Sequence, residues 1–463
     1  MRSTAPAGVF YFAIMAQTLR PYQVQAIDEL RKSIARHRRS ILCVPTGGGK
    51  TTIVASMIES AISKNKRILF LAHRKELLHQ ATERLQQFGL KPGLIQGGNT
   101  QTSLILNVAS VQTLRNRLYC ILPPDIIFID ECHLSAAKSY QTILNHFPDA
   151  YVVGMTATPT RLDGKPLGDI YNHIVNPIKI HQLTELNFLC PVRKFASKEH
   201  IDMSDVQTVA GDYNSRQLFD KFNKSKLYAG VVDNYLKFAR GRPFIVFCVN
   251  VEHSKKTAEA FRSVGISCQH LDGESNTSER DSTIAMFRSG LIQGICNVGL
   301  FTEGFDIPHI SCVIINRATQ SLALYLQMIG RGLRLAPNKS DLIVIDHGDN
   351  VIRHGWYDHD HEWSLNPKKK KKSDKLQAMA VRLCENCEAM MPVNMRTCPE
   401  CGYTKIIVEK APVEAEFAEL SRPKVPEHLR KKWRDMTEDE LKEFASFRGY
   451  KPGWVKHQLK LRA

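Results

Sequence analysis

A glycine-rich turn between an apolar run and a helical pattern constrains this chain most. Residues 41–44 (ILCV) are typical of a buried strand, and residues 52–58 (TIVASMI) place apolar side chains at helical spacing. Between them, the three glycines of residues 45–51 (PTGGGKT) let backbone N–H groups approach phosphate oxygens without a side-chain clash. A strand, such a turn and a helix N-terminus together predict a phosphate-binding loop in an α/β protein.

This loop predicts a nucleoside triphosphate site. Lys50 is expected to reach the β- and γ-phosphates, and the Thr51 hydroxyl is expected to ligate Mg²⁺. Val44 stands where the strict pattern has its first glycine, so a turn that binds nothing is the alternative for the loop alone. The other residues in and beside the loop that are expected to contact the nucleotide are Pro45, Thr46, Gly47, Gly48, Gly49 and Thr52.

Two adjacent carboxylates follow a second apolar run, residues 125–129 (DIIFI). Asp130 is expected to hold Mg²⁺, and Glu131 to orient and deprotonate the attacking water. Such a pair is costly to bury without a cation, which favours a metal site. A solvated strand end is the alternative, and the upstream phosphate loop argues against it.

Further motifs follow in the order found in superfamily 2 helicases, which the chain resembles from residue 19 to residue 334. Residues 19–23 (LRPYQ) resemble the adenine-reading motif, which implies that Gln23 contacts the base with Arg20 nearby. Residues 154–159 (GMTATP) resemble motif III and residues 327–334 (QMIGRGLR) resemble motif VI. The resemblance implies two tandem RecA-like lobes with parallel sheets and ATP between them.

Motif VI implies that Arg331 and Arg334 face the γ-phosphate from the second lobe. Three residues apart, they share a helix face and could stabilise transition-state charge as arginine fingers; surface ion pairs are the alternative. The resemblance implies coupling of hydrolysis to motion for His133, Thr156, Thr158 and Gln327. It implies nucleotide contact through motif V for Gly304 and Asp306, and nucleic-acid backbone contact through motifs Ia and Ib for His73, Arg74, Gln112 and Thr113.

Details within the motifs favour a DNA enzyme. Residues 130–133 read DECH, and residues 303–309 (EGFDIPH) and 330–337 (GRGLRLAP) resemble the bacterial RadD group, with a phage relative equally compatible. The resemblance implies an ATP-dependent DNA helicase or translocase of repair, recombination or replication, acting on single-stranded or branched DNA. It also implies a cytoplasmic, nucleoid-associated location. An RNA helicase is one alternative. The other is a scaffold whose ATPase is activated by a protein partner.

The charge balance agrees with a polyanionic partner. With 63 basic and 46 acidic residues the formal net charge is +17 and the pI is about 9.3, although a generically basic surface is an alternative. No apolar run approaches the roughly 18 residues of a membrane span. Eight of the 12 cysteines lie in the expected motor, mostly in apolar runs typical of reduced core residues.

Two C-x₂-C pairs, ten residues apart, predict a structural zinc site. The expected ligands are Cys384, Cys387, Cys398 and Cys401, whose four thiolates would complete a tetrahedral shell and supply the folding energy of a very small module. Free or disulfide-bonded pairs are the alternative. Such a module could bind DNA or a protein partner.

The sequence therefore predicts six segments. Beyond the zinc module, Thr437 and Glu440 form a capping-box pattern, and Tyr450 and Trp454 are expected to pack in a small helical core rather than stack on bases. Translation is expected to begin at Met15. The segments are an N-terminal extension (1–17), lobe 1 (18–185), lobe 2 (186–352), a basic linker (353–380) with lysines at 368–372, the zinc module (381–405) and a basic helical tail (406–463).

Overall fold

The computed structural model divides the chain into two compact units, Met1–Ala418 and Glu419–Ala463, which are described separately. The N-terminal extension with Met15 and the lysine run at 368–372 lie outside the described residues. The described residues are 19–161, 166–197, 201–209, 211–222, 225–302, 307–366, 381–383, 390–392, 396–397, 402–404, 417–420, 426–429, 431, 433–448, 450 and 452–460.

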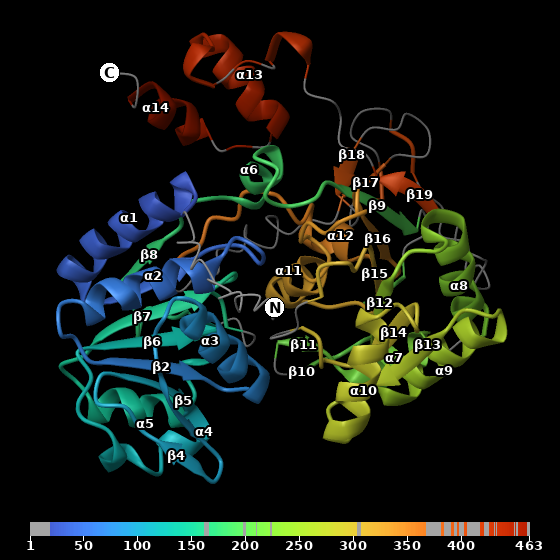
Figure 1. Ribbon diagram of the computed structural model, residues 1–463. Coiled ribbons are helices and arrows are strands. Elements are labelled where there is room, and N and C mark those ends of the chain that lie inside the picture. Colours follow the sequence, from blue (N-terminus) through green and yellow to red (C-terminus); the bar gives the residue numbers. More distant parts are fainter. Residues whose placement is uncertain are drawn as a thin grey trace, which may run out of the picture. The chain divides into compact units, whose positions relative to one another are not determined.

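An eight-stranded sheet forms the first lobe, in the order β4-β3-β5-β2-β6-β7-β1-β8, and only the β3–β4 pair is antiparallel (Figure 1). Its strands are β1 (Arg39–Cys43), β2 (Ile68–Ala72), β3 (Gly93–Gln96), β4 (Asn99–Gln101), β5 (Leu106–Ser110), β6 (Ile126–Asp130), β7 (Tyr151–Thr156) and β8 (His173–Val175). Its helices are α1 (Pro21–His37), α2 (Lys50–Ile62), α3 (Lys75–Gln87), α4 (Val111–Leu114), α5 (Lys138–His146) and α6 (Ile180–Glu185).

The strand order of this sheet assembles the site. Strands β6, β7 and β1 are neighbours, although β6 and β1 are far apart in sequence. In the parallel register Cys43 lies beside Thr156, and Asp130 lies beside Met155. The phosphate loop, the carboxylate pair and motif III therefore leave the sheet at the same carboxyl edge, where ligands bind in open α/β sheets.

A seven-stranded sheet forms the second lobe, in the order β13-β14-β12-β15-β16-β9-β19. Its strands are β9 (Val192–Ser197), β12 (Phe244–Cys248), β13 (Cys268–Leu271), β14 (Gly294–Asn297), β15 (Cys312–Asn316), β16 (Leu342–Asp346) and β19 (Phe417–Leu420), and β10 (Thr208–Val209) pairs separately with β11 (Asp212–Tyr213). The helices are α7 (Ser215–Phe222), α8 (Ser225–Ala239), α9 (Val251–Ser263), α10 (Thr277–Arg288), α11 (Leu322–Gly330) and α12 (Asn350–His354).

Both sheets follow from runs of apolar residues. The strands β2, β5, β12, β15 and β16 are buried at every position, as expected for parallel strands covered on both faces. The prediction of two RecA-like α/β lobes is confirmed. The eight motor cysteines are free thiols, and all but the half-buried Cys120 are buried. Among the described residues, no helix combines the length and apolar character needed to cross a bilayer.

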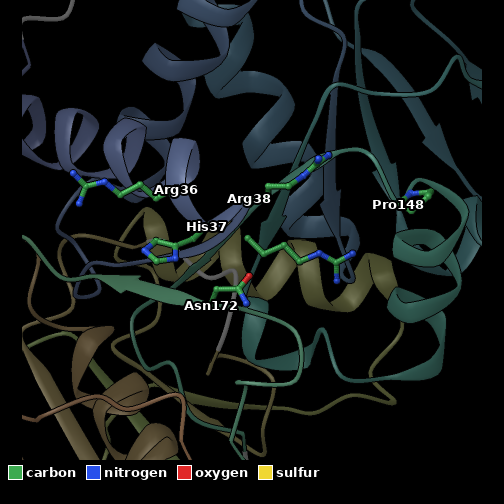
Figure 2. A pocket seen from close by; sticks show the side chains of 6 residues that line it. Arg36, His37, Arg38, Pro148 and Asn172 are labelled. Atoms are coloured by element: carbon green, nitrogen blue, oxygen red, sulfur yellow. The ribbon is translucent and has the colours of Figure 1, made fainter.

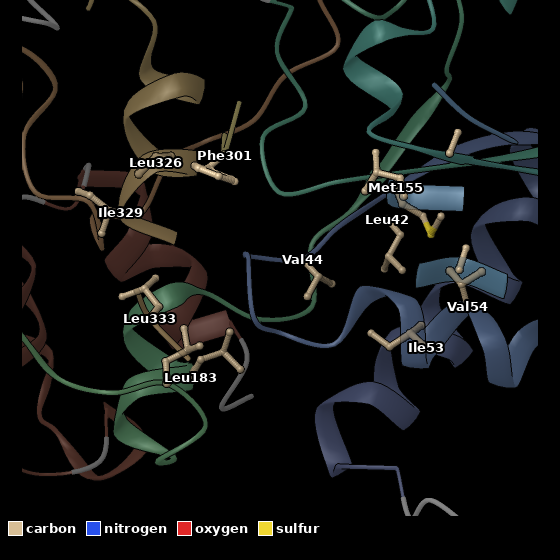
Figure 3. Packing of buried hydrophobic residues seen from close by; sticks show 14 of the residues in the cluster. Leu42, Val44, Ile53, Val54, Met155, Leu183, Phe301, Leu326, Ile329 and Leu333 are labelled. Carbon is tan, nitrogen blue, oxygen red and sulfur yellow. The ribbon is translucent and has the colours of Figure 1, made fainter. Parts of the chain in front are cut away.

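One apolar cluster contains residues from both lobes (Figure 3). Val44 and Ile53 come from the phosphate-loop region, and Leu333 comes from motif VI. Leu183 of α6 joins the same cluster, and the Cys190 N–H donates to the Leu333 carbonyl at 2.9 Å. The segment from α6 to Cys190, which leads from lobe 1 to lobe 2, is therefore packed next to the phosphate loop and motif VI.

The residues after β16 also contribute to these cores. Tyr357 is buried at 3% exposure, and Trp363 packs against two apolar clusters, one with residues from both lobes and one with residues of lobe 1. Lys194 Nζ lies 4.1 Å from the ring centre of Trp356 and 3.8 Å from the Asp358 carboxylate. Residues 353–366 form the start of the segment that the sequence assigned to a basic linker, and in the structure some of their side chains pack against the apolar clusters of the motor.

The second unit contains a small helical hairpin of α13 (Glu438–Arg448) and α14 (Pro452–Lys460). The predicted capping box is present: the Thr437 N–H donates to Glu440 Oε2 at 2.8 Å, and the Glu440 N–H donates to Thr437 Oγ1 at 3.2 Å. Tyr450 and Trp454, with ring centres 4.6 Å apart, pack against its apolar core. Their packing role, expected from the sequence, agrees with this arrangement.

Candidate active site

The phosphate loop leaves the carboxyl end of β1 and leads directly into α2. Gly47 and Gly49 have φ angles of 82° and 79°, a left-handed conformation that favours glycine. A Cβ at Gly49 would lie 2.4 Å from Gln23 Nε2, so a larger residue would displace the Gln23 side chain as well as strain the backbone. Because α2 begins at Lys50, its first N–H groups have no partner within the helix and are available to phosphate oxygens.

The two threonines after Lys50 have different surroundings. Thr51 is exposed at the start of α2, where its hydroxyl is accessible to an incoming ligand. Thr52 Oγ1 accepts a hydrogen bond from Arg84 Nη2 at 2.8 Å. Arg84 lies on α3, and nothing in the local sequence pattern indicated this contact. It ties α3 to the helix that carries Lys50.

The adenine-reading motif is attached to the phosphate loop. The Tyr22 hydroxyl donates to the Gly48 carbonyl at 2.8 Å. Gln23 is buried at 4% exposure, and its Oε1 accepts from the Arg20 N–H at 2.9 Å. The Arg20 guanidinium lies 3.9 Å from the ring centre of Phe188, an aromatic residue that sequence reasoning missed because it lies in no motif. The start of lobe 1 thus meets the first residues after α6 beside the loop.

The carboxylate pair lies opposite the lysine of the loop. Glu131 Oε1 is 3.9 Å from Lys50 Nζ, and the Glu131 side chain is largely buried. Glu131 has a φ of 48°, an unusual conformation for a non-glycine residue that turns the chain sharply at the end of β6. Strain of this kind concentrates at functional sites, and here it places Glu131 beside the phosphate loop.

Thr156 of motif III and His133 both contact the Glu131 carboxylate. Thr156 Oγ1 donates to Glu131 Oε2 at 3.3 Å, and His133 Nδ1 lies 3.3 Å from the same oxygen. The Thr158 N–H in turn donates to Thr156 Oγ1 at 3.1 Å. Thr156, Thr158 and His133 therefore form one connected group with Glu131, the carboxylate expected to activate water.

Asp130 has the electrostatics of a metal-binding carboxylate. The pKa of Asp130 is raised to about 6, chiefly by burial and next by the Glu131 carboxylate, with Lys50 opposing. A divalent cation would relieve this burial cost, and carboxylate and hydroxyl oxygens are the ligands that Mg²⁺ prefers. Asp130 and the exposed Thr51 hydroxyl therefore fit the magnesium site that the sequence predicts.

Motif VI of the second lobe approaches the phosphate loop. A Cβ at Gly330 would lie 2.8 Å from Thr46 Cβ, and a Cβ at Gly47 would lie 3.7 Å from Arg334 Cγ. Burial lowers the pKa of Arg334 to about 10, which leaves the guanidinium charged near neutral pH. Arg331 Nε donates to the Gln327 carbonyl at 3.4 Å. The Arg334 side chain thus lies beside the phosphate loop at Gly47.

Two predicted coupling residues carry unpaired polar atoms. Gln327 Nε2 and Thr158 Oγ1 are buried, and neither has a hydrogen-bond partner within the described part of the chain. A buried donor left unpaired costs on the order of 1–3 kcal/mol, so such groups need an explanation. A ligand or a second arrangement of the site would satisfy them, as expected of residues that respond to nucleotide.

The residues predicted to contact the nucleic-acid backbone differ in exposure and in their hydrogen bonds. Arg74 Nε donates to His73 Nε2 at 3.3 Å, and Arg74 Nη1 donates to the Leu300 carbonyl of lobe 2 at 3.2 Å. Gln112 is exposed, whereas Thr113 Oγ1 accepts from the Gly97 N–H at 3.0 Å. The motif V residues predicted to contact nucleotide, Gly304 and Asp306, lie outside the described residues.

The four predicted zinc ligands, Cys384, Cys387, Cys398 and Cys401, also lie outside the described residues. The positions that flank each pair are described. Leu383 pairs with Met390 in the antiparallel β17 (Val381–Leu383) and β18 (Met390–Pro392), and Thr397 forms an antiparallel bridge with Thr404. Within the described residues, no group of three or more potential metal ligands is gathered in one place.

Comparisons with known proteins agree with this geometry. The family model described as "Type III restriction enzyme, res subunit" matches residues 16–161, and that described as "Helicase conserved C-terminal domain" matches residues 228–336. A 51.5 kDa protein of a Lactococcus phage is 32% identical over 82% of this chain and 82% of its own length.

Two further relatives cover the motor. The Saccharomyces cerevisiae protein named "Putative ATP-dependent helicase IRC3" is 33% identical over 72% of this chain, which spans only 51% of that protein. The solved structure of the ATP-dependent Type ISP restriction-modification enzyme LlaBIII bound to DNA is 18% identical, with a TM-score of 0.55. It covers 71% of this chain and 28% of its own, and shows the shared fold. The chain therefore belongs to the superfamily 2 helicases of the DEAD/DEAH type, a family of nucleic-acid-dependent ATPases.

Proposed function

We propose that this protein is a DNA motor, which hydrolyses ATP to move on or remodel DNA in repair, recombination or replication. One observation carries the proposal: Lys50, Glu131, Thr156 and His133 form one connected group, and Arg334 approaches the same loop from the second lobe. Because ATP would contact residues of both lobes, its binding would draw the two lobes together. Hydrolysis then releases the closure, which is the stroke of a motor.

The residues divide the chemistry among them. Lys50 neutralises the β- and γ-phosphates, and Glu131 accepts a proton from the attacking water. Thr156 and His133 orient Glu131, and Arg334 stabilises the charge that develops on the transferred phosphoryl group. Asp130 and Thr51 would hold Mg²⁺, which supplies further charge neutralisation at the phosphates when bound.

The choice of DNA over RNA rests on sequence details and on relatives. The DECH box at 130–133 and Gln327 at the start of motif VI differ from the pattern of RNA-remodelling helicases. A restriction-enzyme family model matches the first lobe, and the solved LlaBIII enzyme is bound to DNA. The net charge of +17 supports a polyanionic partner of either kind. We propose single-stranded or branched DNA as the substrate.

The ATPase rate with different polymers tests this function. The steady-state rate is measured without nucleic acid and then with single-stranded DNA, duplex DNA, a forked junction and single-stranded RNA, with Glu131→Gln as the hydrolysis-deficient control. Stimulation by DNA but not by RNA is expected. Equal or greater stimulation by RNA would overturn the DNA assignment, and a rate indifferent to every polymer would indicate an ATPase activated by a protein partner.

We also propose that the four cysteines bind one structural zinc ion. The two C-x₂-C pairs occupy equivalent positions: each begins directly after the first residue of an antiparallel pair, Leu383 with Met390 or Thr397 with Thr404. The partners are seven positions apart in both cases (390 − 383 and 404 − 397). Antiparallel pairs at equivalent positions beside both C-x₂-C motifs are compatible with the double-knuckle arrangement of a four-cysteine site.

Metal analysis of the purified full-length chain is expected to find one zinc per molecule. Cys387→Ser and Cys401→Ser should each lose it, because three thiolates bind Zn²⁺ far more weakly than four. Cys120→Ser, which changes a half-buried cysteine of the motor, is the matched control and should retain the metal. Zinc-free protein purified under reducing conditions without chelator would contradict the assignment.

A further inference from the structure

A basic pocket lies on the first lobe, at the end of β1 opposite the phosphate loop. It has a volume of about 430 Å³ and is lined by Arg36, His37, Arg38, Arg39, Pro148 and Asn172. Arg36 and His37 end α1, and Arg39 begins β1. Since the nucleotide motifs follow the carboxyl end of β1, the length of the strand separates the pocket from the ATP site, roughly 15 Å at about 3.3 Å per residue. Neither the motifs nor the proposed mechanism uses it.

In the part of the chain that the structure describes, the positive charge of the pocket is not neutralised by neighbouring carboxylates. Within the described residues, no ion pair joins Arg36, Arg38 or Arg39 to a carboxylate. Arg38 Nη2 donates instead to the backbone carbonyl of Asp149. The negative end of the α1 dipole favours cations in the last helical turn, which accounts for Arg36 and His37. It does not account for the two arginines that follow the helix.

The backbone and the neighbouring side chains fix this arrangement. Arg38 has a φ of 54°, a conformation usually left to glycine, so a long cationic side chain is placed where the backbone disfavours it. The His37 ring stacks on His173 with ring centres 5.0 Å apart, and His173 Nδ1 lies 2.9 Å from the buried Ser33 hydroxyl. Figure 2 shows Arg36 and Arg38 extending in different directions on either side of His37 and Asn172.

We infer that this pocket binds phosphate groups of a nucleic-acid backbone, as a second contact remote from the ATP site. Guanidinium groups match phosphate oxygens geometrically, and the Asn172 side chain adds a neutral donor. Arginines that spread apart suit successive phosphates of a strand better than one compact anion. The lining offers no apolar platform for a nucleobase of the kind that nucleotide pockets use. The inference rests on the proposed function in one respect: the bound phosphates are taken to belong to nucleic acid.

The test compares two double variants of the full-length chain that lose equal charge. Arg36→Gln/Arg39→Gln removes two pocket arginines. Arg31→Gln/Lys32→Gln removes two exposed cations of the same helix that do not line the pocket. DNA affinity is measured by fluorescence anisotropy across a range of NaCl concentrations. The slope of log K against log salt should fall by about 1 for each lost phosphate contact in the pocket variant, and stay unchanged in the control.

The outcomes separate this inference from the proposed function. Unstimulated ATPase would remain unchanged in both variants, since neither touches the nucleotide site. Equal salt slopes for the pocket variant and wild type would overturn the inference even if DNA stimulates the wild-type ATPase. A free anion is the other source of phosphate. Thermal stabilisation by inorganic phosphate at matched ionic strength, lost in the pocket variant while the DNA slope is kept, would replace the backbone with a small anion and overturn the inference.

Discussion

The Lys50→Ala variant is expected to lose ATP hydrolysis while it keeps the wild-type fold. Lys50 Nζ lies 3.9 Å from Glu131 Oε1, and Lys50 begins the helix that follows the phosphate loop. Without it, the charge on the β- and γ-phosphates has no fixed counter-ion from the loop. Removal of one such electrostatic contact typically lowers kcat by about 10²–10³-fold. Here the rate should fall by at least this factor, to background.

The measurement pairs steady-state ATPase with circular dichroism and a nucleotide-binding assay. Alanine is a good helix former, so α2 should remain intact in the variant. Lys64→Ala, at an exposed position just after α2, is the matched control and should hydrolyse ATP at the wild-type rate. Glu131→Gln should retain ATP binding, which distinguishes loss of the phosphate contact from loss of the base. Normal turnover by a well-folded Lys50→Ala protein would refute the site.

The Arg334→Ala variant should lose most of its ATP hydrolysis rate while its affinity for nucleotide changes much less. Arg334 comes from the second lobe and reaches the phosphate loop near Gly47. Although burial lowers its pKa to about 10, the guanidinium stays charged near neutral pH and can stabilise negative charge in the transition state. Arginines in this role contribute on the order of 10³–10⁵ in rate, so kcat should fall by about 10³-fold or more.

Two further variants define the role of Arg334. Arg334→Lys keeps the charge but loses the planar fork, so it should recover only part of the rate. Arg288→Ala, in the last turn of α10 and exposed, controls for the loss of an arginine from lobe 2. If Arg334 only packs the lobes together, alanine would raise KM and lower stability with little change in kcat. That pattern of kinetics and thermal melting would assign Arg334 a structural role.

The local parts of this protein could be predicted from sequence because their chemistry depends on short spacing. Three glycines followed by Lys50 can make one kind of turn, and Asp130 and Glu131 directly after an apolar run can face only the edge of a sheet. The capping box of Thr437 and Glu440 is equally local. Runs of apolar residues were sufficient for the α/β class and for the strands that precede the phosphate loop and the carboxylate pair.

Contacts that depend on strand order could not be predicted from spacing. The Tyr22 hydroxyl reaches Gly48 across 26 positions, and Arg20 lies over Phe188, which belongs to no motif. Arg84 reaches Thr52 only because α2 and α3 pack side by side. The sequence also describes residues 353–366 as polar, yet Tyr357 and Trp363 are packed into apolar clusters. Each contact joins elements that the chain alone does not bring together.

The sequence by itself determined the chemical groups: a phosphate loop, a carboxylate pair, two arginines and four cysteines. Only the tertiary structure decided which of the groups in the motor meet. Because β1, β6 and β7 are neighbours, Glu131 lies within reach of both Lys50 and Thr156. The pairing of β1 with β8 places Arg39 and Asn172 together at the opposite edge, where a basic pocket forms. The physical reason is that residue type is local, whereas proximity follows from long-range pairing of strands.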